Sequence, residues 1–171
     1  MWSRRTLLFA VVMVCALSLV WLLRATRSPL ALVLSTVSPG DGILNAVHDG
    51  DAATVRILLE RGVSVETRDR HGSGTLLIHA ARLGHTDVVR LLLDEGADLE
   101  AENAFGNSAL LLAAEFQHSE VVALLVSRGA DPLHQSKRGN TPLSCARRRG
   151  NPGIVRVLEA ASRGEGGRRG P

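Results

Sequence analysis

The chain has 171 residues and a formal net charge of +3, and 45% of its residues are hydrophobic. This content is too apolar, and this charge too small, for an intrinsically disordered protein. Only 3% of the residues are aromatic, so Leu, Val and Ala must build any core. The two cysteines, Cys15 and Cys145, exclude a multi-disulfide framework and a metal site made of four cysteines.

An uncharged apolar segment, residues 6–23, follows Arg4 and Arg5. As a helix, this segment would extend roughly 27 Å, close to the roughly 30 Å of a bilayer's hydrocarbon core. It is longer than the apolar region of about 7–15 residues in a cleaved signal peptide. We therefore expect an N-terminal apolar helix within residues 1–27 that crosses the membrane as an uncleaved signal anchor. A cleaved signal peptide and a buried helix of the following domain are the alternatives.

Arginines flank this apolar segment on both sides, so the positive-inside rule is nearly balanced. The very short N-terminal flank favours an N-terminus on the cytoplasmic side. We therefore expect a single-pass membrane protein whose remaining chain is extracytoplasmic, or periplasmic in a bacterium. An exported soluble protein is the alternative. Residues 28–40 are expected to form a linker.

Residues 41–161 contain a pattern with a period of about 33 residues. The register is shown by Val55, Val89, Val122 and Val155, which are separated by 34, 33 and 33 residues. Such a period indicates stacked supersecondary units. In the second copy, residues 72–81 are predicted to begin one helix, which ends at Gly84. Apolar residues at i, i+3 and i+4 then predict a second helix.

We divide this segment into four repeats followed by a Gly/Arg-rich tail. The repeats are predicted at about residues 41–69, 70–102, 103–135 and 136–161, and the disordered tail at residues 162–171. Polar residues on the first helix of the first copy, and arginines on that of the last, are typical of the capping repeats that a solenoid requires.

The second copy reads Thr75-Leu-Leu-Ile-His-Ala-Ala, Gly84-His85, Val88-Val89 and Gly96-Ala97-Asp98, and the fourth contains Gly139-Asn-Thr-Pro-Leu. These motifs resemble those of the ankyrin-repeat family, whose units read roughly G-x-TPLHxAA-xxGH-xxVVxxLLxxGAD. The resemblance covers about 120 of the 171 residues. It implies an all-α fold, a solenoid of antiparallel helix pairs with hairpin-like fingers, and a concave surface that binds proteins.

Three features depart from the family pattern. Ile78, Leu111 and Ser144 replace the histidine of the TPLH motif, so we expect its hydrogen-bond network between repeats to be absent. The second copy has an extra residue within residues 71–73, which predicts an irregular finger. Gln117 stands where the other copies have glycine.

The polar residues show no catalytic or metal-binding pattern. The six histidines lack the i, i+4 spacing of two ligands on one helix, and His85 and His118 occupy a structural position of the repeat. Cys145 is predicted to lack an acidic residue that would orient a catalytic base. The sequence contains no nucleophile elbow, phosphate-binding loop or paired-carboxylate motif. We therefore predict a non-enzymatic protein without a metal or other cofactor.

Charge is distributed unevenly along the repeats. Residues 41–135 carry 7 basic and 15 acidic side chains, whereas residues 136–161 carry 6 basic and one acidic. We interpret Arg147, Arg148 and Arg149 as a solvated cap at the end of a helix, where cations suit the helix dipole. The alternative is a site for an anionic lipid headgroup or an acidic partner. Nucleic acid is not expected, because neither aromatic residues nor a nucleic-acid-binding motif accompany these arginines.

The family resemblance places partner contacts at the fingertips, residues 68–73, 102–107 and 135–140, and at two variable positions after each Ala-Ala pair. The candidate partner-binding residues are Arg70, His71, Arg82, Leu83, Phe105, Asn107, Glu115, Phe116, Arg138, Arg148 and Arg149. Phe105 and Phe116 are the expected anchors, because aromatic side chains often dominate interface energy. The alternative is that each ring packs between adjacent repeats.

These expectations combine into a membrane-tethered ankyrin scaffold that binds a protein partner through its concave face and fingers. The alternative is an exported regulatory or inhibitory subunit of an enzyme, which is soluble after its leader is cleaved. The two differ in whether the N-terminal segment is retained.

Overall fold

The computed structural model describes residues 39–164. The predicted apolar helix within residues 1–27, most of the predicted linker, and the predicted tail from residue 165 onward lie outside the described residues. Within residues 39–164, no helix is both long enough and apolar enough to cross a membrane.

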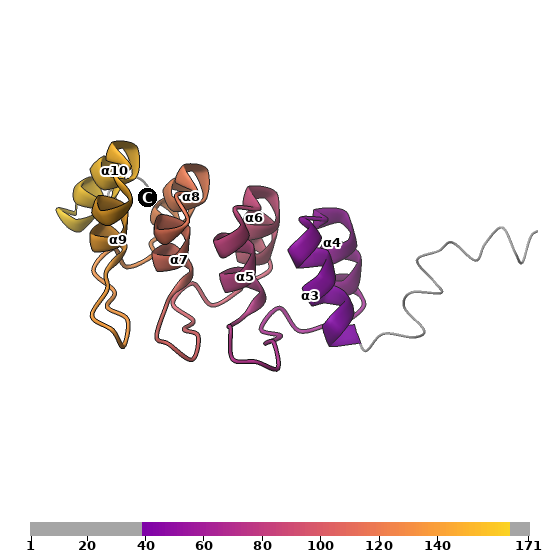
Figure 1. Cartoon of the computed structure of the whole chain (residues 1–171). Coiled ribbons are helices and arrows are strands. Elements are labelled where there is room, and N and C mark those ends of the chain that lie inside the picture. The colour runs from indigo at the N-terminus through magenta and orange to yellow at the C-terminus, as the bar shows by residue number, and fades with distance from the viewer. Residues whose placement is uncertain (1–38, 165–171) are drawn as a thin grey trace, which may run out of the picture. The chain divides into compact units, whose positions relative to one another are not determined.

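The described residues form helix pairs that stand side by side in a row (Figure 1). The pairs are α3 (Pro39–Asp49) with α4 (Ala52–Glu60), α5 (Leu76–Leu83) with α6 (Thr86–Asp94), α7 (Ala109–Glu115) with α8 (Ser119–Ser127), and α9 (Pro142–Arg149) with α10 (Pro152–Ser162). First helices contact first helices, as α5 and α9 both contact α7, and second helices contact second helices. This arrangement confirms the predicted all-α solenoid of helix pairs.

Two helices extend beyond the predicted repeat boundaries. Helix α3 begins at Pro39, ahead of the predicted start at residue 41. Proline suits the first turn of a helix, because its φ is already helical and the N–H that it lacks has no partner there. Helix α10 continues to Ser162, the first residue of the predicted tail, where the Ser162 hydroxyl donates to the Glu159 carbonyl at 2.9 Å.

Small and apolar side chains fill the contacts between neighbouring helix pairs. The first helices α5 and α7 each contribute two fully buried alanines: Ala80, Ala81, Ala113 and Ala114. Their small size allows the backbones of successive first helices to approach closely. Ile78 and Leu111, which replace the TPLH histidine, are also buried, so apolar packing takes the place of that histidine's hydrogen bonds.

Two histidines connect consecutive repeats. His85 Nε2 lies 3.0 Å from the carbonyl oxygen of His48, and His118 Nε2 lies 2.9 Å from that of Arg82. Each of these contacts joins the loop after a first helix to the preceding repeat. They confirm the structural role predicted for His85 and His118. Hydrogen bonds between repeats are therefore made at this second histidine position, whereas Ile78 and Leu111 at the TPLH position pack without them.

The turn after each first helix requires a left-handed residue. Gly84 ends α5 with a φ of 82°, and a Cβ atom at this position would lie 2.4 Å from Nδ1 of His118. Gln117 occupies the equivalent position after α7 with a φ of 65°. In the repeat that follows Gln117, Asn151 replaces the histidine, so no imidazole ring packs against this turn. Because Asn151 replaces the histidine in the next repeat, the turn at position 117 has room for a residue other than glycine.

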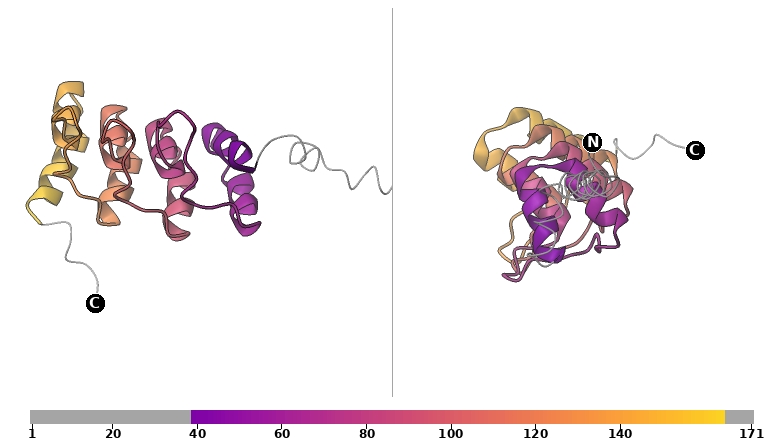
Figure 2. Two further views of the ribbon diagram at one scale, coloured as in Figure 1. Left: turned by 90° about the horizontal axis from the view of Figure 1, so that it is seen from below. Right: turned by 90° about the vertical axis from the view of Figure 1, so that its right-hand side faces the viewer.

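Three loops project from the same side of the helix pairs (Figure 2). We name them finger two (residues 69–74), finger three (residues 103–107) and finger four (residues 136–140). In each finger, the backbone N–H of the last residue donates a hydrogen bond to the side chain of the first residue. The accepting atoms are Asp69 Oδ1, Asn103 Oδ1 and Ser136 Oγ. Finger two contains one residue more than the other two, which confirms its predicted irregularity.

Backbone hydrogen bonds join neighbouring fingers. The Ala104 N–H donates to the Gly72 carbonyl at 3.0 Å, and the Lys137 N–H donates to the Phe105 carbonyl at 3.1 Å. The Lys137 ammonium also donates to the Ala104 carbonyl at 2.9 Å. These hydrogen bonds hold neighbouring fingers in register with one another, in addition to the attachment of each finger to its own helices.

Candidate functional site

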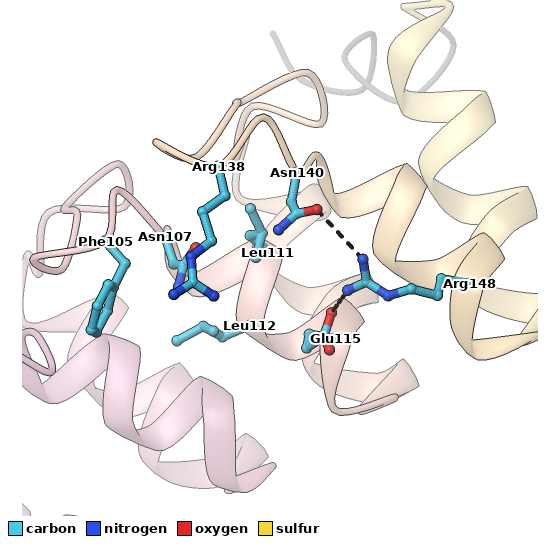
Figure 3. A pocket seen from close by; sticks show the side chains of 8 residues that line it. All are labelled: Phe105, Asn107, Leu111, Leu112, Glu115, Arg138, Asn140 and Arg148. Atoms are coloured by element: carbon cyan, nitrogen blue, oxygen red, sulfur yellow. Dashed lines mark hydrogen bonds and ion pairs between the residues drawn. The ribbon is translucent and has the colours of Figure 1, made fainter.

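A pocket of about 260 Å³ lies between fingers three and four and the helices α7 and α9 (Figure 3). Its lining combines apolar, amide and charged side chains: Phe105, Asn107, Leu111, Leu112, Glu115, Arg138, Asn140 and Arg148. Two adjacent repeats supply these residues in equivalent positions, because each repeat places its finger and the end of its first helix on the same side. Five of the residues predicted to bind a partner meet here, namely Phe105, Asn107, Glu115, Arg138 and Arg148.

Phe105 and Arg138 form the fingertip side of the pocket. Phe105 is 55% exposed, so it does not pack in the core between repeats. The Arg138 guanidinium carbon lies 5.8 Å from the centroid of this ring, within the range of a cation–π contact. Finger four thus places a cation over an accessible aromatic ring of finger three.

Glu115 anchors the helical side of the pocket. Its side chain is 20% exposed, and its carboxylate accepts hydrogen bonds from Arg148 and from Arg149, the latter at 2.5 Å. Arg148 also donates to Asn140 Oδ1 at 3.4 Å. Burial raises the pKa of Glu115, but the neighbouring Cys145 thiol, Arg149 and Arg148 outweigh it, so the pKa lies below its ordinary value. Glu115 is therefore ionised at neutral pH and is shared by two cations.

The buried thiol of Cys145 lies behind this pair. Arg148 Nη2 is 3.6 Å from Cys145 Sγ, and burial together with the Glu115 carboxylate raises the pKa of the thiol to about 11. The register of the stack places Glu115 of the preceding repeat beside Cys145, where the carboxylate contacts the thiol itself and Arg148 but orients no histidine. A thiol with a raised pKa is nevertheless a poor nucleophile, since the thiolate is the reactive form.

The arginines at the end of α9 do not form a single cationic surface. Arg147 Nη2 is 2.7 Å from Glu159 Oε1 on α10, whereas Arg148 and Arg149 turn toward Glu115 on α7. Successive residues of a helix point about 100° apart, which explains the divergence. Each of the three guanidinium groups thus has a carboxylate partner within the repeats.

The other predicted partner-binding residues lie outside the pocket. Phe116 ends α7 and is 48% exposed, so it too is absent from the core. Arg82 and Leu83 are half-buried at the end of α5. On finger two, Arg70 donates to Asp41 Oδ2 at 3.1 Å and His71 is exposed. Leu111 and Leu112 line the pocket but are not among the predicted partner-binding residues. Asn140 lies within the predicted fingertip 135–140 and matches Asn107 in the repeat register, although it is not among the candidates named individually.

A second polar cluster lies at the junction of finger two and α5. Thr75 Oγ1 and His79 Nε2 are buried without a hydrogen-bond partner among residues 39–164, and Asp69 Oδ1 is 3.9 Å from His79 Nε2. Burial lowers the pKa of His79 more than the Asp69 carboxylate raises it. The imidazole is therefore neutral at pH 7. Across the same residues, no cluster of three or more His, Cys, Asp or Glu side chains is arranged to hold a metal ion.

Comparison with known proteins agrees with the geometry of the repeats. A family model described as ankyrin repeats (3 copies) matches residues 43–136 and 101–164. A search of curated proteins found no match.

Proposed function

This chain belongs to the ankyrin-repeat family, and we propose that it is a membrane-tethered scaffold that binds a protein partner through its fingers and first helices. Ankyrin repeats typically act as non-catalytic protein–protein interaction modules. The partner-binding surface and the membrane tether lie in different parts of the chain and are supported by different observations.

The observation that supports the binding surface is the exposure of Phe105 and Phe116, the two phenylalanines of residues 39–164, in a protein with only 3% aromatic residues. Phe105 lies on finger three and Phe116 at the end of α7, both in the third repeat. When a partner covers an exposed aromatic ring, the complex is stabilised by roughly 25 cal/mol per Å² of apolar surface removed from water. Buried aromatic anchors of this kind commonly dominate protein interfaces.

Site-specific photo-crosslinking in the native host tests the binding surface. A photoreactive amino acid is placed at Phe105, at Phe116 and, as a control, at Ile57, an exposed apolar residue of the second helix α4. We expect Phe105 and Phe116 to yield one common covalent partner and Ile57 to yield none. Equal crosslinking from Ile57, or no crosslinking from either phenylalanine, would contradict the proposed surface.

The tether rests on the sequence of residues 6–23 and is tested on the native protein. An uncleaved anchor predicts a protein that begins at Met1 and stays in the membrane fraction after alkaline carbonate extraction. External protease should digest the repeats only from the extracytoplasmic side. A soluble protein with a new N-terminus would instead support the alternative, an exported regulatory or inhibitory subunit of an enzyme.

A further inference from the structure

The fingertip side of the pocket carries an unneutralised cation. Arg138 is exposed, and among residues 39–164 no carboxylate oxygen lies within ion-pair distance of its guanidinium group. Its contact with the Phe105 ring satisfies no N–H donor in a hydrogen bond. Glu102, a carboxylate next to finger three, lies 3.8 Å from His134 Nε2.

The helical side of the pocket also has an excess of positive charge. Arg148 and Arg149 share the single carboxylate of Glu115, so this group keeps one net positive charge. The Cys145 thiol adds no negative charge at neutral pH, because burial and Glu115 raise its pKa to about 11. The pocket is thus cationic at two points, whereas residues 41–135 as a whole are strongly acidic.

Amide and apolar groups occupy the space between these two points. Asn140 accepts from Arg148 through its oxygen, which leaves its NH₂ group as a donor, and Asn107 lies opposite it on finger three. Leu111 and Leu112 of α7 form the floor, and the Phe105 ring forms one edge (Figure 3). Such a lining matches a carboxylate that is bonded to, or adjacent to, an apolar group.

We propose that this pocket binds an acidic, extended segment of the protein partner, with an Asp or Glu side chain beside Arg138 and a neighbouring bulky apolar side chain against Phe105 and Leu112. The inference rests on the proposed function and adds the chemistry of the ligand. A basic segment is excluded, because it would bring its positive charge beside the positive charges of Arg138 and Arg148. Arg147, which would be needed for a broad lipid-binding surface, pairs with Glu159 instead.

Peptide selection on the full chain, purified in a mild detergent, tests this ligand chemistry. Random linear peptides are displayed on phage and selected against the wild-type protein, and the affinities of enriched peptides are measured by fluorescence anisotropy. The pocket variant is Arg138→Glu. Its matched control is Arg56→Glu, which reverses the same charge on the exposed surface of α4. Arg138→Gln, which only removes the charge, serves if Arg138→Glu lowers the thermal midpoint.

We expect the enriched peptides to pair an acidic residue with a bulky apolar one. Arg138→Glu should weaken their binding at least about tenfold, and Arg56→Glu should leave it unchanged. Binding should also weaken as the salt concentration rises, because charges at the rim of an interface are screened. Replacing the acidic residue of an enriched peptide with its amide should reproduce the effect of Arg138→Glu.

Several results would overturn the inference: enrichment of basic or purely apolar peptides, acidic peptides that bind Arg138→Glu as tightly as wild type, or no enrichment at all. Self-association that Arg138→Glu abolishes in sedimentation experiments would assign the pocket to a second copy and would also overturn it. The crosslinking experiment keeps the two proposals separate. A partner captured at Phe105 together with failure of acidic peptides refutes the ligand chemistry and leaves the binding function intact.

Discussion

Substitution of Gly84 tests how the repeats are held together at the turn after each first helix. An alanine at this position must adopt a left-handed backbone, which costs an L residue about 1–2 kcal/mol. Its Cβ atom would also lie 2.4 Å from Nδ1 of His118 and would displace the imidazole ring. The ring then loses its hydrogen bond to the Arg82 carbonyl, worth about 0.5–1.5 kcal/mol. We therefore expect Gly84→Ala to lower the free energy of unfolding by about 2–3 kcal/mol.

Gly96 provides a matched control for this substitution. Its φ is 83°, nearly that of Gly84, but a Cβ atom there would meet nothing within 4 Å. Gly96→Ala should therefore show only the backbone cost of about 1–2 kcal/mol. The double variant Gly84→Ala/His118→Asn combines a non-glycine residue at the turn with asparagine in place of the histidine, as Gln117 and Asn151 do in the following repeats. Its destabilisation should be smaller than the sum of the two single effects, since the clash and the lost hydrogen bond involve the same ring.

Urea unfolding of the full chain in a mild detergent, followed by far-UV circular dichroism, measures these free energies. Equal destabilisation by Gly84→Ala and Gly96→Ala would refute the reasoning, because it would show that the His118 ring yields to the new methyl group without cost. Additive effects in the double variant would likewise show that the two positions are not coupled.

Replacing Phe105 and Phe116 together with alanine should abolish co-purification of the partner that the crosslinking experiment identifies and leave the thermal midpoint nearly unchanged, since both residues are exposed; a large loss of stability would make them core residues. Thr75→Val removes a buried hydroxyl without a hydrogen-bond partner in residues 39–164 and should raise the free energy of unfolding by about 1 kcal/mol, measured by urea unfolding. A decrease would show that the hydroxyl is satisfied in solution. Burial lowers the pKa of His79, so the unfolded chain binds a proton more readily, and stability should fall as the pH drops below about 6.5. His79→Gln should reduce this loss, and identical pH profiles for both proteins would contradict the assignment.

Local sequence patterns predicted the helix pairs because each pair depends on short-range chemistry. The apolar spacing in each second helix and the glycine after each first helix recur in register, and the alanine pairs mark the close contacts between first helices. The extra residue of finger two was also visible in the alignment of copies. The start of α3 was missed because the repeat register begins at residue 41, whereas proline can begin a helix earlier.

The candidate site was predicted less completely. The family resemblance, carried over by the repeat register, named Phe105, Asn107, Glu115, Arg138 and Arg148 as candidate partner-binding residues. The structure brings these five together in one pocket, because equivalent positions in adjacent repeats lie side by side. The register did not predict that Arg148 and Arg149 would share Glu115, or that Glu115 would lie beside Cys145. Long arginine side chains have several partners within reach, and their choice depends on the positions of charges in three dimensions.

Local spacing and composition are enough to predict the repeated helix pairs, the small residues between them and the apolar N-terminal segment. Which charges neutralise one another depends instead on the three-dimensional packing of the repeats. Arg147 turns to Glu159 within its own repeat, Arg148 and Arg149 turn to the preceding repeat, and Arg138 keeps no carboxylate within residues 39–164. Ion pairs form between groups that packing brings within a few ångströms, and their Coulomb energy falls with distance in space and not with separation along the chain.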